Sequence, residues 1–236
     1  PLTEEIVRDA AGNSAVALVI IGRTAGEDRD ALNEPGSYML TDVEEDMLKK
    51  VREAFEKMEV VLNVGSIIDM SFVDNFKPDA VLCAWQGGML GGLGTADVLI
   101  GKVSPSGKLT DTVAYEIEDY PSNSNFGKGI EDIYCEDIYV GYRYFETFAR
   151  DRGRYPFGHG LSYTSFSVKA ENFEYDNKSL KIKFEVRVKN TGEVSGKEVV
   201  QIYGQAPGKI LDKPARELVA YKKTISGGFR GRTICQ

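Results

Sequence analysis

Residues 15–22, AVALVIIG, decide the fold of the first half of the chain. They form an uninterrupted apolar run with the length of a β-strand, and the run ends at a glycine. A strand without polar residues is typical of a parallel sheet covered on both faces, because neither side of it can face water. We therefore predict a strand here that is buried on both faces.

The residues that follow alternate helical patterns with further apolar runs. A helix is predicted from Thr41, because Thr41 and Glu44 form a capping box and acidic residues fill the first turn. Its apolar stripe consists of Val43, Met47, Leu48, Val51, Phe55 and Met58. Residues 60–64 and 80–85 predict two more strands, and residues 91–100 predict another helix. This order predicts an α/β fold with a mostly parallel sheet sandwiched by helices.

Two loops of this expected sheet are candidate ligand loops. Ligands of such sheets bind outside the carboxyl ends of the strands, where loops converge and helix N-termini point. Residues 23–38 follow the first predicted strand, and residues 86–93 follow the third. A functional site is therefore expected on one or both of them.

The second half of the chain has a different pattern. Seven carboxylates against the single Lys128 lie between Glu116 and Asp137, in a segment that reads as a long ordered connection or an excursion onto a neighbouring domain. Further on, runs separated by turn signals predict strands over residues 166–173, 180–188, 198–203 and 217–222. These are too few for a complete β-sandwich, which has about seven. The expected organisation is an α/β domain over residues 1–115, a connection over 116–160 and a partial β-sandwich over 161–236.

Composition excludes several classes of function. The 236 residues have a net charge of −7, and acidic residues dominate up to residue 160, which argues against nucleic acid because phosphates need basic partners. No apolar run approaches the roughly 18 residues of a membrane span, so no membrane partner is expected. The 3 cysteines lie far apart and His159 is the one histidine, so neither a disulfide framework nor a metal site is predicted.

Three motifs could be interpreted as ligand-binding or catalytic sites. The glycine cluster at residues 87–94 is similar to a phosphate-binding turn, but Asp97 stands where its third glycine belongs, so close packing is preferred. His159 has no second histidine and no GxSxG element to work with, which favours a turn residue over a catalytic triad. Trp85 ends a predicted strand, where it either stacks on a sugar or belongs to the core. No cofactor is expected.

Glu27, in the loop after the first strand, is the remaining catalytic candidate. A general acid needs a carboxyl group that holds a proton near neutral pH and then recovers it. Burial and neighbouring carboxylates raise such a pKa, whereas the guanidinium of Arg29 lowers it. Charged loops are usually just solvated, so the pattern alone leaves both interpretations of Glu27 open.

Eight stretches of the chain, in sequence order, carry a recognisable pattern: AVALVIIGRTAGEDRD, VVLNVGS, AVLCAWQGGMLGG, ADVLIGKVSPSGKLTDT, EDIYVGYRYFET, YPFGHGLSYTSF, VKNTGEVSGKEVVQIY and KPARELVAYKK. In this order they resemble the C-terminal half of glycoside hydrolase family 3, the β-glucosidase and β-xylosidase family. The resemblance extends over residues 15–223 and implies an α/β sandwich domain followed by a fibronectin type III-like domain.

The resemblance also implies a chemistry based on two carboxylates. In this family a nucleophilic aspartate belongs to a (β/α)8 barrel, and a general acid/base glutamate belongs to a loop of the α/β domain. Glu27 matches that glutamate, and Arg29 is the expected substrate-binding residue beside it. A retaining enzyme holds its two carboxyl groups about 5 to 5.5 Å apart, so that one attacks the anomeric carbon while the other protonates the leaving oxygen.

Nothing in the sequence reads as the barrel, a fold of about 250 residues, so the isolated chain is expected to be inactive. The first strands of the family's α/β domain are missing, and residues 225–236 show no strand alternation. These departures predict a truncated fragment. In the AWQGG loop, Met89 and Leu90 stand where the family usually has polar residues.

Two functions from different classes remain. The first is part of a retaining β-glycosidase that hydrolyses terminal β-linked glucosyl residues, with a β-glucoside or β-xyloside as substrate and the barrel as partner domain. The second is a non-catalytic carbohydrate-binding or interaction module derived from such an enzyme. Either is compatible with a homo-oligomer. Unpaired cysteines and the lack of a leader predict a cytoplasmic location, or a secreted or periplasmic one if a signal precedes the segment.

Overall fold

The computed structural model describes residues 2–24, 31–127, 130–131, 133–208, 210–224 and 231–233. The chain forms two compact units. Unit 1 comprises residues 1–95 and 115–119, and unit 2 comprises residues 96–114 and 120–236. The domain bounds expected from the sequence stay a prediction.

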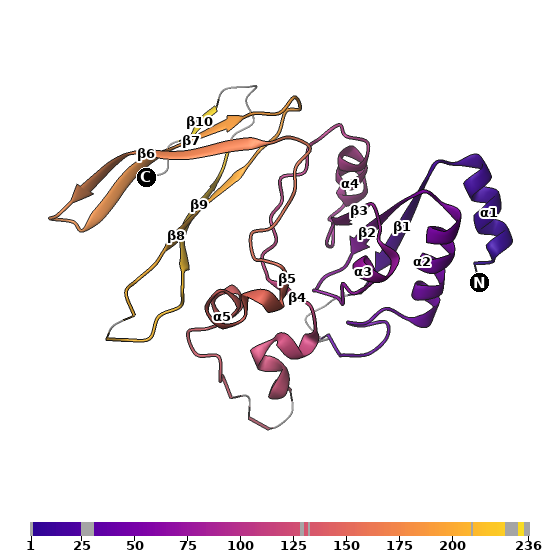
Figure 1. Ribbon diagram of the computed structural model, residues 1–236, viewed down its shortest axis with the longest axis horizontal. Coiled ribbons are helices and arrows are strands. Elements are labelled where there is room, and N and C mark those ends of the chain that lie inside the picture. Colours follow the sequence, from indigo (N-terminus) through magenta and orange to yellow (C-terminus); the bar gives the residue numbers. More distant parts are fainter. Residues whose placement is uncertain are drawn as a thin grey trace. The chain divides into compact units, whose positions relative to one another are not determined.

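Unit 1 is built on a three-stranded parallel sheet in the order β1–β2–β3 (Figure 1). The strands are β1 (Val16–Gly22), β2 (Lys57–Asn63) and β3 (Ala80–Cys83). Gly22 pairs with Asn63, and Leu62 pairs with Cys83, so all three strands end at the same edge. The predicted parallel sheet is confirmed, although β2 begins at Lys57 rather than at residue 60.

Helices precede and connect these strands. α1 (Glu4–Asn13) precedes β1, α2 (Asp42–Ala54) connects β1 to β2, and α3 (Phe72–Phe76) connects β2 to β3. The 3-10 turn η1 (Ile117–Asp119) belongs to the same unit, whereas α4 (Gly91–Leu99) follows β3 and its residues are divided between the two units. α2 packs on β1 and β2, and α1 packs beside α2 (Figure 1). α2 is the helix that the alternating pattern predicted after the first strand, and α1 is a further helix that precedes β1 in the chain.

The start of α2 is defined by the predicted capping box. The hydroxyl of Thr41 accepts a hydrogen bond from the Glu44 backbone N–H, and the Glu44 carboxylate accepts one from the Thr41 backbone N–H. Leu48 and Val51 of the predicted stripe are buried on α2, whereas Val43 is exposed. Phe55 and Met58 are buried too, but the prediction that they continue the helix is wrong, because Phe55 caps the end of α2 and Met58 belongs to β2. Val43 lies five residues before Leu48, which is about 140° round a helix from it, so it points away from the sheet.

The prediction that both faces of β1 are buried is wrong for the described residues. Val19 and Ile21 are buried, but Val16, Leu18 and Ile20 on the opposite face are exposed by 40–61%. Alternate side chains of a strand point to opposite faces, so only one face of β1 is covered. The central strand β2 matches the prediction, because consecutive side chains from Val60 to Leu62 are buried.

Unit 2 contains three small antiparallel sheets (Figure 1). The first pairs β4 (Val113–Ala114) with β5 (Gly153–Tyr155), the second has the order β10–β7–β6, and the third pairs β8 with β9. The longer strands are β6 (Phe166–Asp176), β7 (Lys181–Asn190), β8 (Val199–Gly204), β9 (Glu217–Lys223) and β10 (Gly231–Thr233). β10 corrects the expectation that residues 225–236 lack strand structure, since it pairs with β7.

Short helices occupy the predicted long connection. These are η2 (Pro121–Ser124), α5 (Tyr142–Phe148) and η3 (Arg150–Arg152). Phe145 of α5 is buried against Ala114 and Ala149, with Tyr120 packed on the same cluster. A second cluster joins Val186 and Val188 of β7 to Val200 of β8. Among the described residues of unit 2, these buried side chains form two separate clusters.

We expect the core of unit 1 to depend on Leu48, whose side chain is fully buried on α2. Leu48→Ala removes buried methyl groups and leaves a cavity, so the free energy of unfolding should fall by about 2–5 kcal/mol. Val43→Ala on the same helix is the matched control, because Val43 is 74% exposed. Urea unfolding of both variants measures the difference, and equal effects of the two substitutions would contradict the burial of the α2 stripe.

Candidate functional site

The carboxyl edge of the unit 1 sheet is where the ends of three strands meet. The backbone N–H of Arg23, just after β1, donates to the carbonyl of Asn63 at the end of β2 over 3.1 Å. The N–H of Ala84, just after β3, donates to the carbonyl of Leu62 over 2.9 Å. Loops leaving this edge start side by side, within about 5 Å of their neighbours. This edge is where α/β sheets bind ligands.

The side chain of Arg23 closes the base of the loop between β1 and α2. Its guanidinium donates to both carboxylate oxygens of Glu44 over 2.6 and 2.8 Å. It also donates to the carbonyl oxygens of Ser37 (3.1 Å) and Met39 (3.2 Å), near the other end of the loop. Since only 8% of the Arg23 side chain and 19% of the Glu44 side chain are exposed, water competes little for these bonds. We call this arrangement the Arg23 clamp.

Glu44 serves the Arg23 clamp and the helix cap at once. Burial raises the pKa of the Glu44 carboxyl, but hydrogen bonds from Arg23 and from the Thr41 backbone outweigh it, so the pKa lies below its usual value. The carboxylate is therefore ionised at neutral pH. The carboxylate of Glu44 thus binds both the backbone at the start of α2 and the Arg23 side chain that follows β1.

The second half of the loop forms a hydrogen-bonded turn just before α2. Gly36 adopts a φ of 85°, a left-handed conformation that favours glycine, and its N–H donates to the Met39 carbonyl over 2.9 Å. Tyr38 and Leu40 are buried, which anchors the turn in the core of unit 1. The described ends of the loop are therefore held by the Arg23 clamp and by burial.

Glu27 and Arg29 lie in residues 25–30, outside the described residues. Their predicted roles as acid/base and substrate-binding residue stay predictions. The flanking residues place the start of their loop at the carboxyl edge, directly after β1. Sequence reasoning missed Arg23, which organises that loop. The sequence feature that could have indicated the Arg23–Glu44 pair is an arginine directly after Gly22, the last residue of β1, together with a glutamate at the third helical position of α2.

The end of β3 forms the second predicted ligand loop. Trp85 adopts a φ of 56°, a left-handed conformation that is strained for a non-glycine residue. A Cβ at Gly87 would come within 2.6 Å of the Gly91 backbone, so this turn requires glycine. That close approach supports the packing interpretation of the glycine cluster. Met89 and Leu90 at the tip of the loop are exposed.

Burial strongly raises the pKa of the Cys83 thiol, to about 11, although a hydrogen bond from the Trp85 backbone opposes this. Cys83 is therefore a thiol rather than a reactive thiolate at neutral pH.

In unit 2, burial and nearby Lys108 lower the pKa of His159, and its ring stacks on Tyr155. Cys83 and His159 therefore both read as structural.

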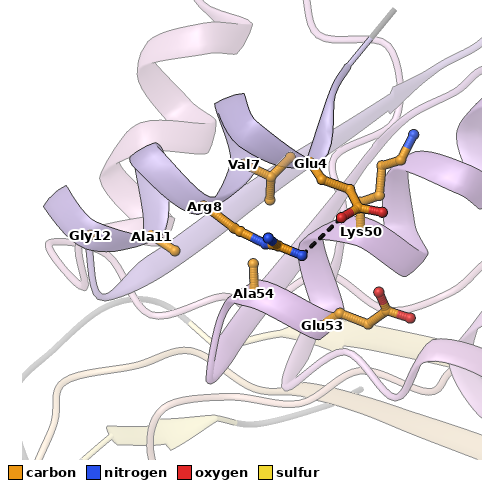
Figure 2. Close-up of a pocket in the computed structure, with 8 residues that line it drawn as sticks. All are labelled: Glu4, Val7, Arg8, Ala11, Gly12, Lys50, Glu53 and Ala54. Carbon is orange, nitrogen blue, oxygen red and sulfur yellow. Dashed lines mark hydrogen bonds and ion pairs between the residues drawn. The ribbon is translucent and has the colours of Figure 1, made fainter.

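A groove of about 390 Å³ lies between α1 and α2. Figure 2 shows the residues that line it, among them Arg8 and Glu4, which form an ion pair. The α2 side of the groove begins at Lys50, nine residues and therefore about 13 Å beyond the start of the helix at Thr41. Because the start of α2 lies by the Arg23 clamp, the groove is remote from the carboxyl edge.

In the described part of the chain, no group of His, Cys, Asp and Glu side chains is arranged to hold a metal ion. Within the same residues, no helix is long and apolar enough to cross a membrane.

We expect Glu44→Gln to isolate the ionic part of the Arg23 clamp, because glutamine still accepts the bond from the Thr41 N–H. Loss of the charged partner of Arg23 should lower the free energy of unfolding by about 1–3 kcal/mol at pH 7. The folded pKa of Glu44 is below its unfolded value of 4.5, so this stabilisation is present above pH 4.5 and is lost as pH falls through the folded pKa.

Urea unfolding of wild type and Glu44→Gln at pH 7 and pH 3 measures this dependence. The gap between the two proteins should narrow at pH 3. A gap that is the same at both pH values would contradict an ionised Glu44 as the partner of Arg23.

Comparison with known proteins gives consistent matches. The family model described as glycosyl hydrolase family 3 C-terminal domain matches residues 3–163. A β-glucosidase of Ruminococcus albus is 56% identical over 224 residues, which covers 95% of this chain and 23% of that protein. β-Glucosidase A of Butyrivibrio fibrisolvens is 42% identical and matches 94% of this chain and 32% of its own length.

Solved structures agree with these relatives. A β-glucosidase from Paenibacillus barengoltzii superposes with a TM-score of 0.95 at 48% identity, over 100% of this chain and 26% of that one. β-Glucosidase 3B from Thermotoga neapolitana gives 0.89 at 36% identity, over 98% of this chain and 33% of that one. The chain thus spans about a quarter to a third of the length of these relatives. It belongs to glycosyl hydrolase family 3 and represents the C-terminal domain region of that family.

Proposed function

We propose that this chain supplies the general acid/base loop of a retaining β-glucosidase, with Glu27 as the acid/base. The observation that supports this most is the 56% identity to a β-glucosidase over 95% of the chain. The proposed acid/base loop also leaves the carboxyl edge of a parallel sheet, the usual ligand edge, and its base is held by the Arg23 clamp.

The proposed reaction assigns one carboxyl group to this chain. Glu27 would donate its proton to the glycosidic oxygen as the bond to the anomeric carbon breaks, and a nucleophilic carboxylate would attack that carbon. Glu27 would then take a proton from the water that releases the sugar. The nucleophile would come from a barrel domain, since the parallel sheet in the described residues has three strands. Arg29 would bind the substrate beside Glu27.

Unit 2 would form part of a fibronectin type III-like sandwich. Val188 of β7 and Val200 of β8 share one buried cluster, which is how the facing sheets of a sandwich pack. The sandwich assignment is part of the same proposal. The proposal also includes a β-xyloside as a second substrate, a homo-oligomeric state and a cytoplasmic location. The free thiols of Cys83 and Cys135 support the location.

The test uses a chimera in which this chain replaces the matching 224 residues of the Ruminococcus albus β-glucosidase. Glu27→Ala in the chimera should lower kcat/KM by about 10²- to 10⁴-fold on substrates with poor leaving groups, because proton donation is lost. Azide should restore turnover of an activated aryl glucoside, since it attacks the glycosyl-enzyme without needing a base.

Glu34→Ala is the matched control, because Glu34 is an exposed glutamate of the same loop. It should keep kcat/KM within a few-fold of the parent chimera. Unchanged kinetics in Glu27→Ala would remove Glu27 from the role. The isolated chain should show no turnover. Sugar binding by it, together with an inactive chimera, would favour the non-catalytic carbohydrate-binding module.

A further inference from the structure

The loop after β3 exposes a cluster of apolar side chains at the carboxyl edge of the unit 1 sheet. Met89 is 104% exposed, Leu90 is 71% exposed and Leu93 is 66% exposed. Apolar surface gains free energy when it leaves water. Three such side chains within one short stretch therefore mark an interaction surface rather than scattered exposure.

The turn that carries these side chains is ordered by its backbone. The N–H of Gly91 donates to the carbonyl of Gly88 over 2.8 Å, and the N–H of Gly94 donates to the carbonyl of Leu90 over 3.0 Å. The second bond belongs to the first turn of α4, while the close approach of Gly87 to Gly91 fixes the other side of the tip. A tip held on both sides presents its side chains without the entropy cost of ordering a loose loop.

Trp85, at the start of the loop, has a backbone conformation that its surroundings must enforce. Its φ of 56° lies in the left-handed region, which costs free energy for a residue with a side chain. Just before it, the N–H of Ala84 donates to the carbonyl of Leu62 and so fixes the chain where it leaves the sheet. Strained residues of this kind cluster at active sites and ligand clamps. The strain at Trp85 therefore supports a functional role for the tip that follows it.

The loop after β3 starts at the same edge as the proposed acid/base loop. In the sheet order β1–β2–β3, the ends of β1 and β3 lie two strand spacings apart, which is about 10 Å. A general acid gives its proton to the glycosidic oxygen, so the leaving group attached to that oxygen lies beside the acid. A leaving group at this edge is therefore within reach of the loop after β3.

The side chains at the tip suit an apolar leaving group. Leucine has no polar side-chain atom, and the thioether of methionine is only a weak acceptor. The hydroxyl groups of a second sugar would lose water against such a surface without gaining partners, which is unfavourable. An aromatic ring instead gains free energy by leaving water, and methionine sulfur makes favourable contacts with ring edges.

We propose that Met89 and Leu90 form the apolar wall of a leaving-group site and select β-glucosides with aromatic leaving groups over β-linked glucose disaccharides. The inference rests on the proposed function and adds the class of substrate to it. Neither side chain can donate a proton to the leaving oxygen. The two residues should therefore change the choice of substrate rather than the acid/base step.

The test compares kcat/KM of the chimera described above for phenethyl β-glucoside and for cellobiose. Both substrates expel an aliphatic alcohol, so both depend on proton donation, and they differ in the group around the leaving oxygen. Met89→Ser combined with Leu90→Ser should lower the ratio of the phenethyl glucoside value to the cellobiose value by about 10-fold, the scale of lost apolar contacts in a pocket. The cellobiose value should not fall, because serine hydroxyls can hydrogen-bond to the second sugar.

Two further variants separate apolar character from other causes. Met89→Leu combined with Leu90→Met keeps the surface apolar and should keep the ratio within two-fold. Val16→Ser is the matched control, because Val16 is a 40% exposed apolar residue at the amino end of β1, six residues and therefore about 20 Å from the carboxyl edge. It should leave the values for both substrates within two-fold.

The outcomes separate this inference from the proposed function. An unchanged ratio in the double serine variant would overturn the leaving-group site and leave the proposed function in place. Equal losses on both substrates would also overturn the site, since they would indicate a general defect of the loop. A 10-fold fall of the ratio in the Met89→Leu, Leu90→Met variant would overturn it because apolar character would not be what is recognised. A chimera inactive on both substrates would remove the proposed function and this inference with it.

Discussion

The ion pair between Arg23 and Glu44 is the interaction on which the candidate site depends. One guanidinium joins the residue that follows β1, the carbonyls of Ser37 and Met39 and the first turn of α2. These groups are the two ends of one loop. Because these bonds are made where water is largely excluded, the loop leaves β1 and enters α2 at fixed points. The Arg23 clamp thereby limits where a catalytic residue between those points can lie.

The clamp works because the sheet beneath it is in register. β1 and β2 end together, since Gly22 pairs with Asn63, and the Arg23 backbone continues this pairing by one more hydrogen bond. Buried Leu48 packs α2 against the sheet, and this packing places Glu44 next to the guanidinium of Arg23. Core packing and loop geometry are thus linked, because a shift of α2 would separate the ion pair.

Local features of this arrangement could be predicted from the sequence. The capping box joins residues three apart, so its spacing is visible in the chain, and the alternation of helices and apolar runs predicts a parallel sheet. The partner of Arg23 is 21 residues away, and no periodic pattern reports such a distance. The burial of β1 was overestimated because an apolar run reads the same with one face covered or with two.

In the second half of the chain, too, some elements could be predicted from the sequence and others could not. The long strands of unit 2 are signalled by alternation, but α5 and the 3-10 turns are too short for periodicity to appear. β10 has only three residues and is defined by its pairing with β7. The proposed role of Glu27 follows from the family resemblance rather than from geometry, because Glu27 lies outside the described residues.

The proposed function implies that the Arg23 clamp positions the proton donor, and the dependence of the rate on the leaving group tests this most directly. In the chimera, kcat/KM of Glu44→Gln would be measured for an alkyl glucoside and for a dinitrophenyl glucoside, whose leaving group departs without protonation. The account predicts a loss of at least 10-fold on the alkyl glucoside and little loss on the dinitrophenyl glucoside. Equal losses on both substrates would contradict it.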